Sequence, residues 1–120
     1  LAQLEAALAI AGPDPPAVEQ GDAADWLEAR LAEPRPAAAT RVVLHSIAFQ
    51  YFPREAKKRI HAMMAEAGAA ATPAEPLAWL RYEHDRRDER ITLRLTIWPG
   101  RERLLAYGHP HGGAVDWLEG

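Results

Sequence analysis

The sequence predicts a mixed α/β fold in which parallel strands with flanking helices are followed by an antiparallel hairpin. Residues 42–44 form a continuous apolar run, which is typical of a strand buried on both faces. Residues 91–98 instead alternate strictly between apolar and polar side chains, which is typical of a strand with one buried face. Stripes of apolar residues at helical spacing separate these segments and predict the helices.

The first third of the chain is predicted to contain two helices joined by a proline-containing segment. Apolar residues at helical spacing predict a helix over residues 1–11, which a Gly-Pro pair ends. We expect a short strand at 17–20. Asp22 is suited to cap a second helix over residues 24–32, because its carboxylate can accept the unpaired N–H groups of the first turn.

The remainder is predicted to alternate strands and one helix before the hairpin. After the strand at 41–45, a proline suited to the first helical turn precedes an amphipathic helix that ends near residue 67. A strand follows at 77–82. Residues 83–90 include seven charged side chains, so we expect a solvated loop there. The strand at 91–98 and its partner at 103–107 flank a Pro-Gly turn and form the predicted hairpin.

Composition restricts the classes of function. The net charge of −3 gives no electrostatic preference for nucleic acid or for an anionic membrane. The absence of cysteine excludes disulfides and cysteine nucleophiles. No apolar run approaches the roughly 20 residues that span a bilayer. We therefore expect a cytoplasmic protein without a nucleic-acid or membrane partner.

The beginning of the chain suggests a longer parent protein. Leu1 already lies within an apolar pattern at helical spacing, without a preceding methionine or capping residue. We expect residues 1–120 to form a single domain that is the C-terminal part of a larger one. The missing N-terminal part of the same chain would then be its first partner.

Several segments carry a resemblance to known families. The Gly-Asp-Ala motif at 21–23 resembles the third-strand motif of class I S-adenosylmethionine-dependent methyltransferases, and segments 42–46 and 50–53 resemble their fourth strand and the turn after it. Segments 4–11, 21–27, 45–53 and 110–112 are similar to the C-terminal half of an uncharacterised bacterial family, a domain of unknown function. The resemblance implies a partial Rossmann-like, methyltransferase-like sheet.

The resemblance also implies roles for individual residues. Asp22 would contact the adenine of the cofactor, although a plain helix cap explains the same residue. His45 would be a general base or substrate contact at the carboxyl end of a strand, with a structural histidine as the equal alternative. Tyr51 is a second catalytic candidate, and Ser46 and Gln50 are candidates for substrate binding. S-adenosylmethionine is implied only for the full-length protein, because this chain lacks the glycine-rich turn that approaches the cofactor.

Two functions remain open at this point. The chain is either part of an enzyme that contributes one wall of a cofactor or substrate pocket, or a non-catalytic binding or interaction module of the same shape. The resemblance places missing strands between segments 17–20 and 41–45, so a homodimer through the exposed sheet edge is also expected. We predict no metal site, since His109 and His111 have no carboxylate at ligand spacing.

Overall fold

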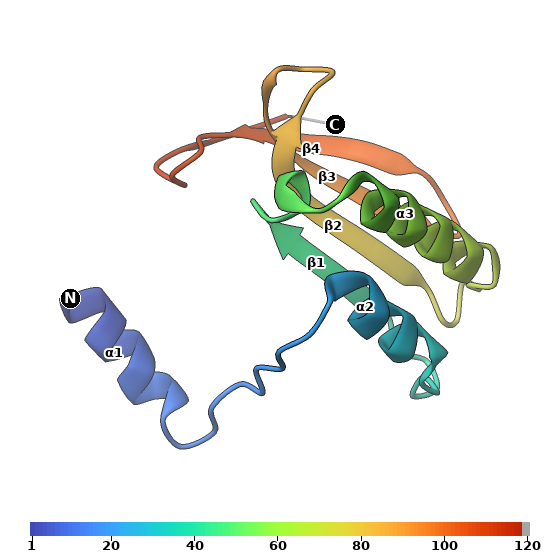
Figure 1. Ribbon diagram of the computed structural model, residues 1–120, viewed down its shortest axis with the longest axis horizontal. Coiled ribbons are helices and arrows are strands. Elements are labelled where there is room, and N and C mark those ends of the chain that lie inside the picture. Colours follow the sequence, from blue (N-terminus) through green and yellow to red (C-terminus); the bar gives the residue numbers. More distant parts are fainter. Residues whose placement is uncertain (119–120) are drawn as a thin grey trace.

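A computed structural model describes residues 1–118 and shows a mixed α/β fold with one open five-stranded sheet (Figure 1). The strands follow one another across the sheet in chain order. The first pair is parallel and the other three pairs are antiparallel. The elements are α1 (Ala2–Ala11), α2 (Ala23–Ala32), β1 (Arg41–Ser46), the 3-10 turn η1 (Phe49–Tyr51), α3 (Arg54–Ala69), β2 (Leu77–Asp85), β3 (Arg90–Trp98), β4 (Glu102–Gly108) and β5 (Val115–Trp117).

The topology corrects three expectations from the sequence. A Rossmann-like parallel sheet is not shown, because only β1 and β2 are parallel and the sheet is mostly antiparallel. Segment 17–20 has no strand, and Val18 is 90% exposed. The predicted hairpin of β3 and β4 is confirmed. It is preceded by a second hairpin, because the charged segment expected to be a loop extends β2 to Asp85 and starts β3 at Arg90.

The local chemistry explains where the main helices begin and how they pack. Asp22 accepts hydrogen bonds from the amides of Ala24 (2.9 Å) and Asp25 (3.1 Å), which confirms its capping role for α2. The helix α3 approaches β3 so closely that a Cβ at Gly68 would lie 2.4 Å from the ring of Trp98. Only glycine permits this contact.

The core lies between the sheet and the two helices α2 and α3, which cover the same face (Figure 1). The side chains that carry this packing come from both helices and from the first two strands. They are Ala24, Leu27, Ile60, Met64, Leu77 and Trp79, with Val43 and Trp98 at the margin. Burial of these apolar groups is the main contribution that holds α2 and α3 on the sheet.

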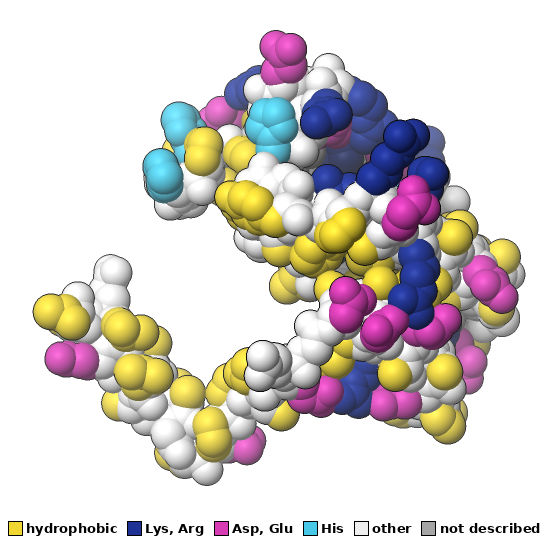
Figure 2. All heavy atoms as spheres, viewed as in Figure 1, with side chains coloured by type: hydrophobic (Ala, Val, Ile, Leu, Met, Phe, Trp, Pro, Cys, Tyr) yellow, Lys and Arg dark blue, Asp and Glu magenta, His cyan; other side chains and the backbone are white. Residues whose placement is uncertain are grey.

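The opposite face of the sheet is apolar and, within residues 1–118, has no helix packed on it (Figure 1). On the edge strand β1, Val42 is 58% and Leu44 is 64% exposed. The helix α1 stands apart from the sheet, and Figure 2 shows its hydrophobic side chains beside a hollow that separates it from the rest. No helix in the described part of the chain is long and apolar enough to cross a membrane.

Candidate functional site

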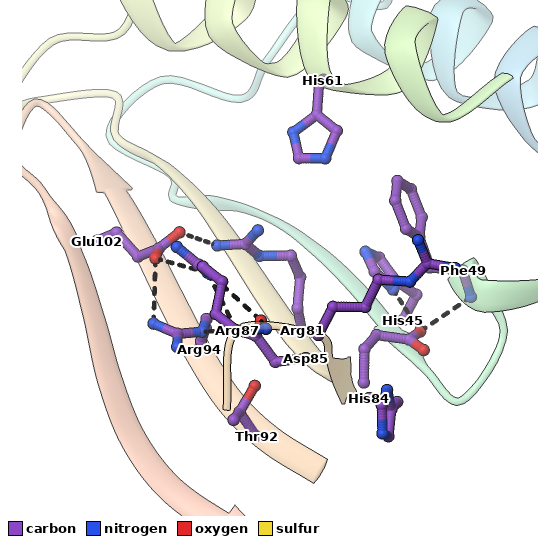
Figure 3. A pocket seen from close by; sticks show the side chains of 12 residues that line it. His45, Phe49, His61, Arg81, His84, Asp85, Arg87, Thr92, Arg94 and Glu102 are labelled. Atoms are coloured by element: carbon purple, nitrogen blue, oxygen red, sulfur yellow. Dashed lines mark hydrogen bonds and ion pairs between the residues drawn. The ribbon is translucent and has the colours of Figure 1, made fainter. Parts of the chain in front are cut away.

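A polar cavity of about 370 Å³ lies between α3 and the sheet, beside the carboxyl ends of the parallel strands β1 and β2 (Figure 3). In open α/β sheets, ligands bind outside these strand ends. The lining residues come from η1, α3 and the first four strands, with the turn between β2 and β3. They are His45, Phe49, His61, Arg81, Glu83, His84, Asp85, Arg86, Arg87, Thr92, Arg94 and Glu102.

The pairing register brings these side chains together. His45 lies opposite Arg81, and Arg81 lies opposite Arg94 on the next strand. Side chains alternate along a strand, so Arg81, Glu83 and Asp85 point to the same face of β2. That face also carries the core residue Trp79. One face of β2 therefore changes from apolar core to charged cavity as the strand runs toward its carboxyl end.

His45 is held through both ring nitrogens. The indole N–H of Trp79 donates to His45 Nε2 at 3.0 Å, and an indole N–H is only a donor. Nε2 is thus the acceptor and Nδ1 carries the hydrogen, which is donated to Glu83 Oε1 at 2.7 Å. The side chain is 17% exposed and stacks on Phe49, with 5.1 Å between ring centroids. This geometry requires a neutral imidazole without a free nitrogen.

Glu83 also anchors the loop that follows β1. Its Oε1 accepts the backbone N–H groups of Ala48 and Phe49, both at 3.1 Å. The preceding residue, Ile47, has a φ of +48°, a conformation that β-branched residues rarely adopt. Such strain persists where surrounding contacts impose it. The second carboxylate oxygen of Glu83 is buried without a partner among the described residues.

Three arginines converge on the carboxylate of Glu102, and we call Arg81, Arg87 and Arg94 the arginine cluster (Figure 3). Arg81 forms an ion pair with Glu102 Oε2. Glu102 Oε1 lies 3.2 Å from Arg94 Nη1 and 3.6 Å from Arg87 Nη2. Burial alone would raise the pKa of Glu102, but the arginines outweigh it and hold the pKa below its usual value. Glu102 is therefore ionised at neutral pH.

Two further acids fix the cluster from the other side. Arg94 Nε lies 2.6 Å from Asp85 Oδ2, and Arg94 Nη2 lies 2.7 Å from Asp88 Oδ2. The side-chain hydrogen bond from Arg87, opposed by burial and reinforced by Arg94, holds the pKa of Asp85 well below its usual range. The Arg81 guanidinium lies 4.4 Å from the centroid of the Trp79 ring, and its Nε is buried without a partner among the described residues.

His61 is the side chain that α3 directs into the cavity (Figure 3). Its ring contacts Trp79 and Phe49, with centroids 5.0 Å and 5.5 Å away. Within residues 1–118 no group hydrogen bonds to it. His61 is exposed overall, but partial burial of its ring, assisted by the charge of Arg81, lowers the pKa of His61. At neutral pH the cavity thus contains a neutral imidazole with an available donor and acceptor.

The sequence candidates do not gather at this cavity. His45 lines it, but Ser46 and Gln50 are exposed and Tyr51 is 76% exposed, and none of the three lines the cavity. Asp22 borders a separate hollow formed with Asp25, Glu55 and Arg59. No group of three potential metal ligands was found among the described residues.

Sequence reasoning missed most residues of the cavity. His61 directly follows Ile60, a core residue of α3, and this position next to the buried face of the helix could have identified His61 as a candidate. Arg81 and Glu83 could have been found by extending the β2 alternation through the charged segment. Arg94 and Glu102 could not have been found from the sequence, because only strand pairing shows that the β3–β4 hairpin lies beside β2.

The arrangement can bind a small polar molecule and exchange a proton with it. The arginines and acids offer hydrogen bonds of both polarities, and an imidazole exchanges protons near neutral pH.

In comparisons with known proteins, a family model described as an uncharacterised protein conserved in bacteria (DUF2332) matches residues 1–117. No curated protein and no solved structure matches the chain.

Proposed function

The chain belongs to this bacterial family, and we propose that it supplies one wall of a binding pocket for a small polar molecule, between α3 and the sheet. The main support for this proposal is the environment of His61. This neutral imidazole has no hydrogen-bond partner in the described chain and lies in a charged cavity at the carboxyl ends of two parallel strands. Clefts with a few convergent polar groups and perturbed pKa values are typical of ligand sites.

Two orphaned polar atoms support the same proposal. Arg81 Nε and Glu83 Oε2 are buried without partners in side chains that line the cavity. Buried polar atoms are nearly always hydrogen bonded, so exceptions point to an absent partner. A bound molecule would bring water or its own polar groups to these two atoms.

The indole N–H of Trp79 is a direct reporter of this site, because it donates to His45 and its ring contacts His61. Acetate, inorganic phosphate, glycine and ethanolamine would be titrated while the proton and nitrogen NMR signals are followed. We expect at least one probe to shift the Trp79 indole and His61 ring signals.

The His61→Gln variant should weaken that binding, and the matched His111→Gln variant, in the exposed loop before β5, should not. If none of the four probes moves these signals, or if both variants bind like the wild type, the pocket proposal is wrong.

The position of Asp22 gives no support to an S-adenosylmethionine site in this chain. Asp22, the residue expected to contact adenine, uses Oδ1 to cap α2 and lies in a different hollow from His45. We propose that these 120 residues alone do not bind this cofactor. Isothermal titration calorimetry would show no heat beyond dilution, and saturable binding would refute this statement.

A second candidate function, as an interaction module, is favoured by the exposed apolar side of β1. This strand is an edge of the described sheet, and Val42 and Leu44 on it are more than half exposed. An unpaired edge with apolar side chains favours pairing with another strand. The isolated helix α1, with Leu4 and Leu8 also more than half exposed, adds a second uncovered apolar surface.

We propose a second copy of this chain as the partner at β1. Sedimentation equilibrium should show a dimer for the wild type and for Val18→Lys, a control in the exposed linker. Leu44→Lys should be monomeric, because a charge would enter the apolar contact. A monomeric wild type at its highest soluble concentration would exclude the homodimer.

A further inference from the structure

We infer that the arginine cluster is a binding site for a small carboxylate or phosphate anion, and that Glu102 occupies this site when the anion is absent. The inference rests on the proposed ligand pocket and names the chemical class of its ligand. In the structure, the Glu102 carboxylate accepts hydrogen bonds from Arg81 and Arg94 and lies within 3.6 Å of Arg87. These contacts are the ones a ligand carboxylate would make.

Arg81 and Arg94 are held in place independently of Glu102. Arg94 is 14% exposed and keeps its ion pairs with Asp85 and Asp88 at 2.6 and 2.7 Å. Arg81 is 15% exposed, lies against the Trp79 ring and donates to Thr96 Oγ1 at 3.3 Å. The two guanidinium groups therefore stay in position when Glu102 leaves, and a preorganised pair binds an anion at low entropic cost.

Glu102 is the most exposed acid of this arrangement. It is the first residue of β4, immediately after the turn that joins β3 to β4, and its side chain is 35% exposed. Rotation of the side chain toward solvent breaks no backbone pairing with Thr96. The Glu102 carboxylate is partly solvated, so solvent screens its ion pairs and an external anion can compete with it.

The charge balance defines the sign of the ligand. The three arginines of the cluster are neutralised by Asp85, Asp88 and Glu102. When Glu102 turns to solvent, one positive charge is left uncompensated, and a monoanion restores neutrality. Glu83 and Arg86 also line the cavity, and because their charges are opposite in sign they leave this balance unchanged.

A purely structural salt-bridge network would leave two features unexplained. The Arg81 Nε is buried without a partner among the described residues, so the network does not satisfy all donors of its central arginine. Arg87 is 65% exposed although it contributes to the cavity lining. Both features fit a site in which a bound anion completes the contacts of Arg81 and draws Arg87 inward.

The test measures acetate and inorganic phosphate binding to the wild type, Glu102→Gln and Glu66→Gln by NMR titration of the 120-residue chain. Glu66 is an exposed residue of α3 outside the cavity, so its variant changes net charge equally. We expect Glu102→Gln to bind the anions about three- to tenfold more tightly than the wild type, equivalent to about 0.7–1.4 kcal/mol. Glu66→Gln should bind like the wild type.

Arg87→Gln supplies the opposite change at an exposed side chain and should weaken anion binding in the Glu102→Gln background. Backbone amide spectra establish that each variant is folded. If Glu102→Gln binds no more tightly than Glu66→Gln, the masking role of Glu102 is refuted. If ethanolamine binds but neither anion does, the anion site is refuted and the proposed pocket stands. If no probe binds any variant, both are wrong.

Discussion

Replacing His45 by asparagine tests whether this residue has a structural role or acts as a general base. In the folded chain His45 joins Trp79 to Glu83 through its two ring nitrogens, at 3.0 and 2.7 Å. The asparagine side chain is shorter and can reach at most one of these partners. The substitution also removes the ring that stacks on Phe49 at 5.1 Å.

The expected loss of stability follows from these contacts. At least one largely buried polar group is left without a partner, which costs about 1–3 kcal/mol. The lost ring contact adds about 0.5–1.5 kcal/mol. We therefore expect the free energy of unfolding to fall by about 2–4 kcal/mol. Glu83 keeps its two backbone donors, Ala48 and Phe49, so the loop after β1 should remain in place.

Urea denaturation followed by circular dichroism measures this difference. The matched control is His111→Asn, in the exposed loop before β5, for which a change within about 0.5 kcal/mol is expected. Equal unfolding midpoints for the two variants would refute the structural role. A general base predicts instead a rate loss of about 10²–10⁴ in an active parent protein with stability retained.

Three other predictions follow from single contacts. Gly68→Ala should lower the free energy of unfolding by about 1–3 kcal/mol, because the added Cβ would enter the Trp98 ring. Gly21→Ala is the control, since Gly21 has open space around it. Equal urea midpoints for the two variants would contradict the close contact between α3 and Trp98. Burial lowers the pKa of His61 in the folded chain, so the unfolded chain binds more protons and the free energy of unfolding should fall as the pH drops below about 6.5. Thermal melts at several pH values should show a weaker pH dependence for His61→Gln. An unchanged dependence would contradict this prediction. Asp22→Ala should cost about 1 kcal/mol in the same urea assay through loss of the α2 cap, and no loss would contradict that role.

Local patterns in the sequence predicted the helices and most strands. The amphipathic stripe of α3, the apolar run of β1 and the alternation of β3 were recognised, because burial of one face leaves a period in the sequence. The end of β2 was not recognised. Glu83 and Asp85 look like loop residues, but Glu83 accepts hydrogen bonds from His45 and two backbone amides, and Asp85 pairs with the arginines beside it.

The sheet order could not be obtained from such patterns. A buried apolar run favours a parallel neighbour on both sides, and this led to the expectation of a Rossmann-like sheet. The structure has one parallel pair, and β1 is the edge of the described sheet with Val42 and Leu44 exposed. Hydrophobic patterns indicate which segments form strands and helices, and they carry no information about which segments pack beside or over them.

The sequence by itself determined the family, the Asp22 cap and the positions of α3, β1, β3 and β4. The tertiary structure alone decided the cavity. His45 and Glu83 are 38 residues apart in sequence, and Arg81 and Glu102 are 21 residues apart. Strand register, which depends on packing across the whole sheet, brings these charges into contact. Capping and periodicity act within a few residues, so they specify elements but not the partners that the elements bring together.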